Sequence, residues 1–206
     1  MQLETGKRGF SLAREAPLDM RMDTSDSSAP TAGDLVNRLS REELGGLIKA
    51  YTDDSYAFRI AKAIVKVRED VGRIETTKDL ALVIETVVGF GQRDAMGRKA
   101  NPATKTFQAL RMLVNDELGE AYAGVWEAAK ILRPASGKLA VLTFHSAEDR
   151  VVKRAIRGLP PDQDNAQMPP SPSPWQPLSR VLTASREELG CNPRARSAKL
   201  RIACRC

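Results

Sequence analysis

The sequence predicts an α/β protein in which an all-helical part precedes a part that combines helices with strands. Apolar residues recur at steps of three and four through residues 31–88, which is the spacing of one face of a helix. The run Leu139–Phe144 is almost continuously apolar, as is typical of a parallel strand covered on both faces. Residues 180–183 and 197–203 have the composition of two short strands that close the edge of a sheet.

Four short amphipathic helices are expected between residues 31 and 100, where they would form a small helical module. Thr31 and Ser40 each stand three residues before an acidic residue, a spacing that predicts a capping box at the start of a helix. The third helix follows the apolar positions of residues 56–67, and one of the threonines 76–77 opens the fourth.

Before this module, residues 1–30 are rich in Gly, Pro, Ser and Asp and are expected to form loop. Within them Pro17–Asp23 alternates charged residues with bulky apolar ones. That pattern fits either a short strand or an ordered loop that lines a site.

The longest predicted helix covers residues 101–132. Asn101 is a good N-cap, Pro102 fits the first helical turn, and apolar residues continue at helical spacing to the end of the segment. The strand follows, and then a helix over about residues 147–157. The segment 159–177 holds seven of the twelve prolines, so we expect a flexible surface loop there.

Composition excludes several classes of protein. Of the 206 residues, 42% are hydrophobic and 28% charged, and no apolar run approaches the roughly 18 residues that a membrane span needs. The three cysteines, two of them in the last three residues, match neither a metal-binding quartet nor a disulfide framework. We therefore expect no metal, no membrane and a reducing compartment.

The formal net charge of +6 is concentrated near the C-terminus, because no acidic residue follows Glu188. The basic residues in that stretch include Arg194, Arg196, Lys199 and Arg201. Clustered guanidinium groups suit phosphate oxygens, so a nucleic-acid partner is one interpretation. A solvated basic tail is the other.

The junction after the predicted strand is the candidate centre of chemistry. His145, the single histidine, and Ser146 come where the strand ends, and this edge of an α/β sheet is where ligands bind. A structural interpretation is also open, since Ser146 and Asp149 have the spacing of a capping box, and Glu148 and Asp149 favour the positive end of a helix dipole. Capping by Ser146 leaves His145 unexplained.

Five stretches, taken together, resemble one family. They are Arg8–Ser11 (RGFS), Pro17–Asp23 (PLDMRMD), Asn101–Arg111 (NPATKTFQALR), Phe144–Arg150 (FHSAEDR) and Asn192–Ser197 (NPRARS). In this order they are similar to the bacterial and organellar small-subunit rRNA cytosine-N4 methyltransferases of the MraW or RsmH type. Two positions depart from the usual pattern, Ala147 in place of leucine and Ala16 in place of glycine.

The resemblance implies a Rossmann-like domain that binds S-adenosylmethionine, interrupted by a helical insert. In this chain residues 1–30 would be a loop remnant of the methyltransferase domain, 31–100 the insert, and 101–206 the C-terminal half of the methyltransferase sheet. The family's glycine-rich first half has no counterpart in the sequence. We therefore expect a chain that is N-terminally truncated by on the order of a hundred residues, at ~30 residues for each βαβ unit.

The resemblance also implies a reaction, the methylation of the exocyclic N4 of a cytidine in small-subunit rRNA with S-adenosylmethionine. The partner would be that rRNA or the ribosomal subunit, in the cytoplasm of a bacterium or in a mitochondrion or plastid. Gln2 matches a cofactor-binding glutamine of the family. The predicted catalytic residues are His145, Ser146, Glu148 and Asp149, and the predicted RNA-binding residues are Arg21, Arg111, Arg194, Arg196, Lys199 and Arg201.

Three hypotheses stay open at this point. The chain is either part of such an enzyme or a non-catalytic RNA-binding remnant that lacks the cofactor-binding half. A fragmentary gene model is the third hypothesis, because half a sheet would expose an unpaired edge that invites aggregation.

Overall fold

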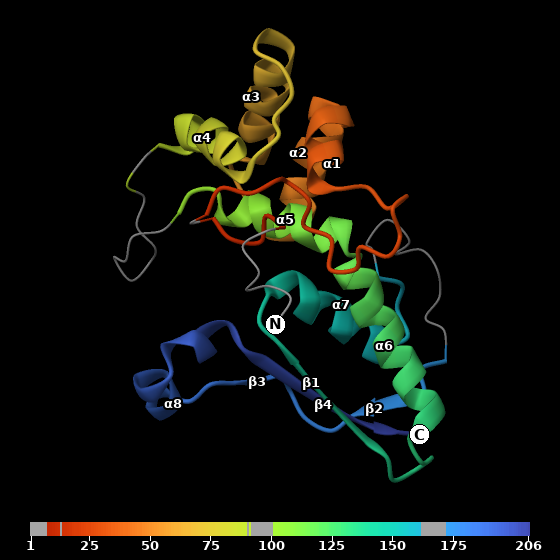
Figure 1. The fold of residues 1–206 in the computed structure, drawn as a ribbon. Coiled ribbons are helices and arrows are strands. Elements are labelled where there is room, and N and C mark those ends of the chain that lie inside the picture. The colour runs from red at the N-terminus through yellow and green to blue at the C-terminus, as the bar shows by residue number, and fades with distance from the viewer. Residues whose placement is uncertain (1–7, 13, 90, 92–100, 162–171) are drawn as a thin grey trace. The chain divides into compact units, whose positions relative to one another are not determined.

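The computed structural model describes residues 8–12, 14–89, 91, 101–161 and 172–206 (Figure 1). The chain divides into two compact units, residues 1–115 and 116–206. The predicted domain boundaries, including the one at residue 100, stay a prediction, although the first compact unit extends to Asn115. Within the described residues, no helix combines the length and the apolar character that a membrane crossing requires.

Within the described residues, every regular element of the first unit is a helix. Its helices are α1 (Ala32–Arg38), α2 (Arg41–Thr52), α3 (Ala57–Asp70), α4 (Thr77–Val88) and α5 (Thr104–Val114). The predicted capping boxes are confirmed at α1 and α2, where Thr31 pairs with Asp34 and Ser40 with Glu43. At α4 Thr76, rather than Thr77, is the N-cap.

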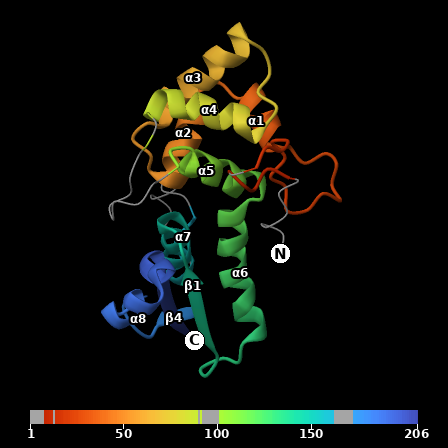
Figure 2. The same cartoon turned by 60° about the vertical axis from the view of Figure 1, so that its left-hand side comes forward.

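One apolar core holds these helices together. Ile60 and Ile64 of α3 are fully buried and belong to the same cluster as Leu44 of α2 and Leu80 of α4. Helix α5 adds to this core and packs against α2, beneath which it lies in Figures 1 and 2. The expected helical module is therefore present, with α5 as a further member of its unit.

The predicted long helix over residues 101–132 is wrong. The chain leaves helical geometry at Asn115, and Asp116 adopts a left-handed backbone conformation with φ of 45°. A new helix, α6 (Glu117–Ile131), then begins in the second unit. Apolar spacing continues through the break, so the sequence pattern alone does not reveal it.

The second unit is a small antiparallel sheet with helices. Its elements are α6, β1 (Lys138–Thr143), α7 (Ser146–Ile156), β2 (Trp175–Pro177), β3 (Leu182–Thr183), α8 (Arg186–Cys191), the 3₁₀ helix η2 (Pro193–Ser197) and β4 (Lys199–Arg205). The strand order is β1-β4-β2, and β3 also pairs with β4. The α/β class is thus confirmed, while the assignment of this sheet to half of a Rossmann-like fold stays a prediction.

Strand β1 differs from its prediction. It pairs antiparallel with β4, and its residues alternate between exposed and partly buried instead of being covered on both faces. Leu139 and Val141 face the second core, which includes Val125 of α6 and Val152 of α7. In Figure 2, α6 and α7 lie side by side. Among the described residues only this face of β1 is packed, which accounts for the alternation.

The predicted strands at residues 180–183 and 197–203 are confirmed as β3 and β4, with shifted ends. The predicted loop 159–177 is wrong at its end, because Trp175–Pro177 forms β2 and the Trp175 side chain is buried in the second core. Residues 162–171 of that loop lie outside the described part of the chain.

Candidate functional site

The turn from β1 into α7 is built around His145, not Ser146. His145 is the N-cap of α7, and its Nδ1 accepts a hydrogen bond of 3.2 Å from the Ala147 N–H. The Glu148 carboxylate reaches back and accepts from the N–H groups of Phe144 at 3.0 Å and His145 at 3.2 Å. The predicted capping box between Ser146 and Asp149 is therefore wrong, and capping does account for His145.

Asp149 has a different partner. Its carboxylate, only 10% exposed, accepts two hydrogen bonds from the Arg201 guanidinium, at 2.7 Å from Nε and 3.0 Å from Nη2. The Lys199 ammonium lies 3.3 Å from the same carboxylate. Lys199 and Arg201 are two residues apart on β4, so both side chains project from the face of the sheet that α7 covers.

These charges set the ionisation of Asp149. Burial alone would raise the pKa of its carboxyl, but the hydrogen bond and charge of Arg201, with the charge of Lys199, outweigh burial and lower the pKa below its ordinary value. Asp149 is therefore a carboxylate near neutral pH, and it ties the first turn of α7 to β4.

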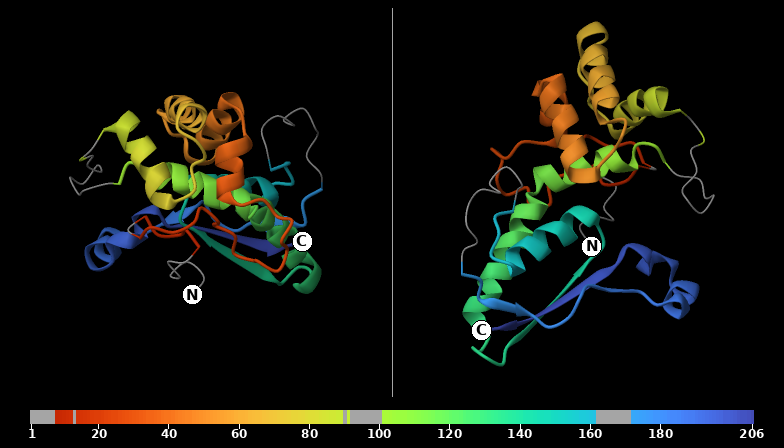
Figure 3. Two further views of the ribbon diagram at one scale, coloured as in Figure 1. Left: turned by 45° about the horizontal axis from the view of Figure 1, so that its top comes forward. Right: turned by 180° about the vertical axis from the view of Figure 1, so that it is seen from behind.

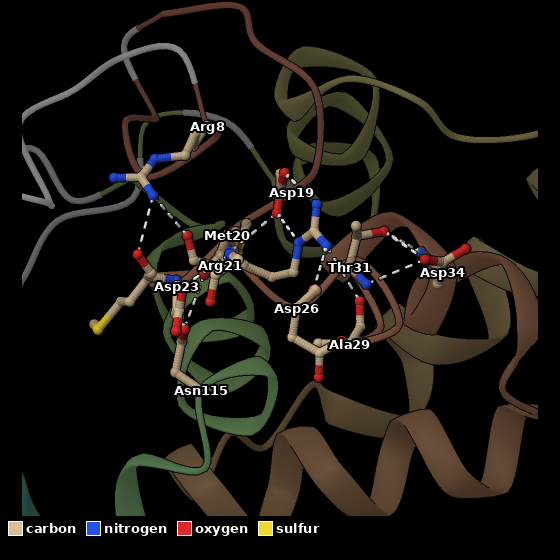
Figure 4. Close-up of polar contacts among 12 residues, drawn as sticks. Arg8, Asp19, Met20, Arg21, Asp23, Asp26, Ala29, Thr31, Asp34 and Asn115 are labelled. Carbon is tan, nitrogen blue, oxygen red and sulfur yellow. Dashed lines mark hydrogen bonds and ion pairs between the residues drawn. The ribbon is translucent and has the colours of Figure 1, made fainter.

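The loop Pro17–Asp23 in the first unit is ordered without being a strand. Arg21 lies within it and donates to the Asp19 carboxylate at 2.7 and 3.0 Å and to the carbonyls of Asp26 and Ala29 at 3.3 and 3.4 Å (Figure 4). The hydrogen bond from Arg21 is the main cause that holds the pKa of Asp19 below its ordinary value. The Arg21 side chain is 16% exposed, so its guanidinium serves mainly the loop itself.

Two side chains from outside the loop fix its backbone. Asn115, at the end of α5, accepts from the Met22 N–H at 2.7 Å and donates to the Met20 carbonyl at 2.8 Å. Arg8 donates to the carbonyls of Arg21 at 3.2 Å and Met22 at 3.0 Å. Met20 is buried and has a φ of 61°, a conformation that costs of order 1–3 kcal/mol in a residue other than glycine. Nothing in the sequence pattern indicates the role of Asn115.

The comparisons with known proteins cover the entire chain. A family model described as the MraW methylase family matches residues 1–206. This chain belongs to the MraW methylase family.

Three curated relatives of this MraW-family chain have names that describe rRNA methyltransferases. Ribosomal RNA small subunit methyltransferase H of Caulobacter vibrioides is 45% identical over 212 residues, which cover 100% of the chain and 65% of the relative. The protein of the same name from Bartonella henselae is 43% identical over 210 residues, covering 100% and 58%. Human 12S rRNA N(4)-cytidine methyltransferase METTL15 is 39% identical over 232 residues, covering 98% and 56%. The chain thus spans between about half and two thirds of the length of these relatives.

Most of the predicted site residues lie in the second unit. His145, Glu148 and Asp149 have structural partners within the second unit, and Ser146 is exposed in the first turn of α7. Among the predicted RNA-binding residues of that unit, Lys199 and Arg201 face Asp149, whereas Arg194 and Arg196 are exposed on η2.

In the first unit of this MraW-family chain, Arg111 lies on α5 and is partly exposed. It lines a cavity of about 330 Å³ together with Met20 and Phe107. Gln2, the predicted cofactor contact, lies outside the described residues. No group of three or more His, Cys, Asp or Glu side chains suited to a metal ion occurs in the described part of the chain.

Proposed function

We propose that this chain is part of a methyltransferase that acts on the exocyclic N4 of a cytidine in small-subunit rRNA. The observation that carries the proposal is the match of the whole chain to the MraW methylase family, whose relatives from bacteria and human are named as small-subunit or 12S rRNA methyltransferases. The partner would be the rRNA or the ribosomal subunit. The location of this protein, in a bacterial cytoplasm or in an organelle, stays a prediction.

The methyl donor that the family implies is S-adenosylmethionine. Rossmann-type domains hold such nucleotides at a glycine-rich turn that follows a parallel strand. The pairings among the described strands are all antiparallel, so the described residues do not fit this donor by themselves. No step of binding the donor is therefore assigned to them.

The chemistry requires that the cytosine be flipped out of its stack and that its amine be held in line with the methyl group. The junction after β1 supplies groups for this task. We assign His145 and the exposed Ser146 to the substrate side, because they are the first polar side chains after the strand. Glu148 and Asp149 are positioning residues, since the first fixes the backbone of residues 144–145 and the second fixes α7 on β4.

The exposed Arg194 and Arg196 of η2 are assigned to rRNA phosphates. A guanidinium group can donate two parallel hydrogen bonds to one phosphate, and both of these side chains are exposed. Lys199, 36% exposed and beside Asp149, would contribute less, and Arg201 least of all.

Deletion of the coding sequence in the source organism tests the function. Small-subunit rRNA from the deletion strain should lose N4-methylcytidine in nucleoside mass spectrometry, and a plasmid copy of the gene should restore it. A deletion strain that keeps all of its N4-methylcytidine would contradict the proposal. Loss of a different methylated nucleoside would assign the protein to another reaction.

A further inference from the structure

Positive charge surrounds a cavity of about 340 Å³ in the second unit. Its walls come from the second half of α7, from the segment 177–181 that leads from β2 towards β3, and from the middle of β4. In the right-hand view of Figure 3, α7 lies over one face of this sheet. None of the described residues that line the cavity is acidic, whereas four are basic, namely Lys153, Arg157, Arg180 and Arg201.

The fold accounts for only part of this charge. Arg201 is bound to the Asp149 carboxylate. Lys153 in the last turn of α7 and Arg157 at its C-cap favour the negative end of the helix dipole. Arg180 lies outside any helix and is exposed, as Lys153 and Arg157 are. Like charges gathered around one cavity raise the local concentration of anions, so the cavity favours an anionic ligand.

Two of these cations continue a row along α7. Arg150, Lys153 and Arg157 are spaced by three and four residues, which places them on one face of the helix. All three are exposed. At 1.5 Å per residue the row is roughly 10 Å long, so a single small anion would occupy only the cavity at its end. A row of this length suits a chain of anions.

We propose that the phosphate backbone of rRNA binds to a surface that we call the α7 basic surface, formed by Arg150, Lys153, Arg157 and Arg180. Three of these four residues are arginines, and a guanidinium group can donate two parallel hydrogen bonds to one phosphate. Ile156 and Val181 give the cavity an apolar wall against which a ribose can pack. The inference rests on the proposed function and adds a backbone contact on elements other than η2.

A cover of other protein residues is a poorer explanation for this surface. Relatives of the chain are longer, but strands added at β1, which pairs with β4 alone among the described strands, would lie on the other side of β4 from the cavity. Apolar residues packed over Lys153, Arg157 and Arg180 would take their charges out of water without a partner, which is costly. An anionic partner is therefore required, and the proposed function supplies the phosphates of RNA.

The test measures RNA affinity with the complete product of the gene and no methyl donor. Binding of a short fluorescein-labelled single-stranded RNA is followed by anisotropy at several salt concentrations. Arg157→Gln and Arg180→Gln should each flatten the slope of log affinity against log salt by about 0.7, which is about fivefold in affinity at about 0.1 M salt. Arg157→Lys keeps the charge and should keep the slope.

Arg133→Gln is the matched control, because Arg133 is exposed between α6 and β1 and does not line the cavity. It should leave the affinity and the slope unchanged. Each of these variants should unfold in urea like the unaltered protein, because the altered side chains are exposed.

Competition identifies the occupant. Unlabelled RNA of the same sequence should displace the labelled strand at a far lower concentration than polyglutamate of equal charge or ADP does. Equal displacement by polyglutamate would assign the α7 basic surface to an acidic protein segment and overturn the proposal. Equal displacement by ADP would assign it to a free nucleotide and overturn the proposal as well.

The inference is also overturned if the unaltered protein does not bind the RNA, or if Arg157→Gln and Arg180→Gln behave like Arg133→Gln. The same holds if Arg157→Lys flattens the slope as much as Arg157→Gln. The proposed methylation is judged separately, from N4-methylcytidine in the deletion strain. Loss of that nucleoside on deletion, together with normal RNA binding by the two glutamine variants, would keep the proposed function and overturn the α7 basic surface alone.

Discussion

Arg201 of β4 holds the Asp149 carboxylate of α7 with two hydrogen bonds, at 2.7 and 3.0 Å. The pair joins the stretch Phe144–Arg150, one of those that resemble the methyltransferase family, to the basic C-terminal strand. It also changes the role expected of each residue. The Asp149 carboxylate is bound to Arg201 and is therefore not available as a proton acceptor. The charge of the Arg201 guanidinium is largely compensated by Asp149, which leaves less of it to attract a phosphate.

Removal of the Arg201 charge should destabilise the second unit far more than removal of the Lys199 charge. Arg201→Met leaves a nearly buried carboxylate without its bidentate partner, and we expect a loss of about 3 kcal/mol. Lys199→Met removes a half-exposed ammonium and should cost less than about 1 kcal/mol. Both tryptophans, Trp126 and Trp175, lie in this unit, so urea unfolding followed by tryptophan fluorescence measures it. Equal losses in the two variants would contradict this account.

The stabilisation from Asp149 should depend on pH in one direction. Its pKa is lowered in the folded protein, so the folded protein binds this proton less tightly than the unfolded chain does. The contribution is therefore complete above the ordinary carboxyl pKa of about 3.9 and is lost as pH falls through the lower folded value. The difference in unfolding free energy between the unaltered chain and Asp149→Asn should be constant from about pH 7 to 5 and shrink below about pH 4. A difference that grows with acidity would contradict the geometry.

The starts of α1 and α2 can be predicted from the sequence because they depend on neighbours three residues apart. Thr31 with Asp34 and Ser40 with Glu43 form boxes that short-range pattern reveals. At α7 two such spacings, His145 to Glu148 and Ser146 to Asp149, are offset by one residue, and pattern alone favours serine as the cap. The structure selects His145 with Glu148, because Asp149 is held by Arg201, which is 52 residues away in the chain. Contacts of that range leave no local signal.

The break after α5 leaves no local sequence signal for the same reason. The Asn115 side chain forms hydrogen bonds with the backbone of Met20 and Met22, which lie 95 and 93 residues earlier in the chain. Asp116 then adopts a left-handed backbone conformation. The spacing of apolar residues predicts neither these hydrogen bonds nor the left-handed conformation. The antiparallel pairing of β1 also cannot be read from its apolar run. Such a run fits a strand that is covered on both faces, and it equally fits a strand with one exposed apolar face, on which Leu142 lies here.

Asn115 should control the order of the loop that holds Met20 and Met22. Asn115→Ala leaves the Met22 N–H without its acceptor and should cost about 2 kcal/mol. Asn115→Asp keeps that acceptor but cannot donate to the Met20 carbonyl, so its loss should be smaller. Hydrogen exchange of the Met22 amide, followed by NMR, should accelerate in the alanine variant and stay slow in the aspartate variant. Fast exchange in the unaltered chain would contradict the role assigned to Asn115.

RNA affinity should depend on salt through Arg194 and Arg196. If each contacts one phosphate of a single strand, Arg194→Gln and Arg196→Gln should each flatten the slope of log affinity against log salt by about 0.7. Lys130→Gln is the control, because Lys130 is exposed in α6 and is paired with Glu127 at 2.6 Å. Fluorescence anisotropy with a short single-stranded RNA between about 50 and 200 mM salt measures the slopes of the three variants and of the unaltered chain. If the arginine variants match the control, the charge of η2 is merely solvated.

His145→Asn should separate the capping role of His145 from a role in methylation. Asparagine is among the best N-cap residues, so it should accept from the Ala147 N–H in place of Nδ1, and the unfolding free energy of the second unit should change by less than about 0.5 kcal/mol. His145→Ala loses the acceptor and should cost about 1 kcal/mol. If the imidazole also acts on the substrate, the asparagine variant, supplied on a plasmid to the deletion strain, should leave N4-methylcytidine in the rRNA well below its usual level although the protein is stable. Full restoration by His145→Asn would leave His145 as a cap alone, and Ser146 would then be the remaining side chain at this junction to test by the same complementation.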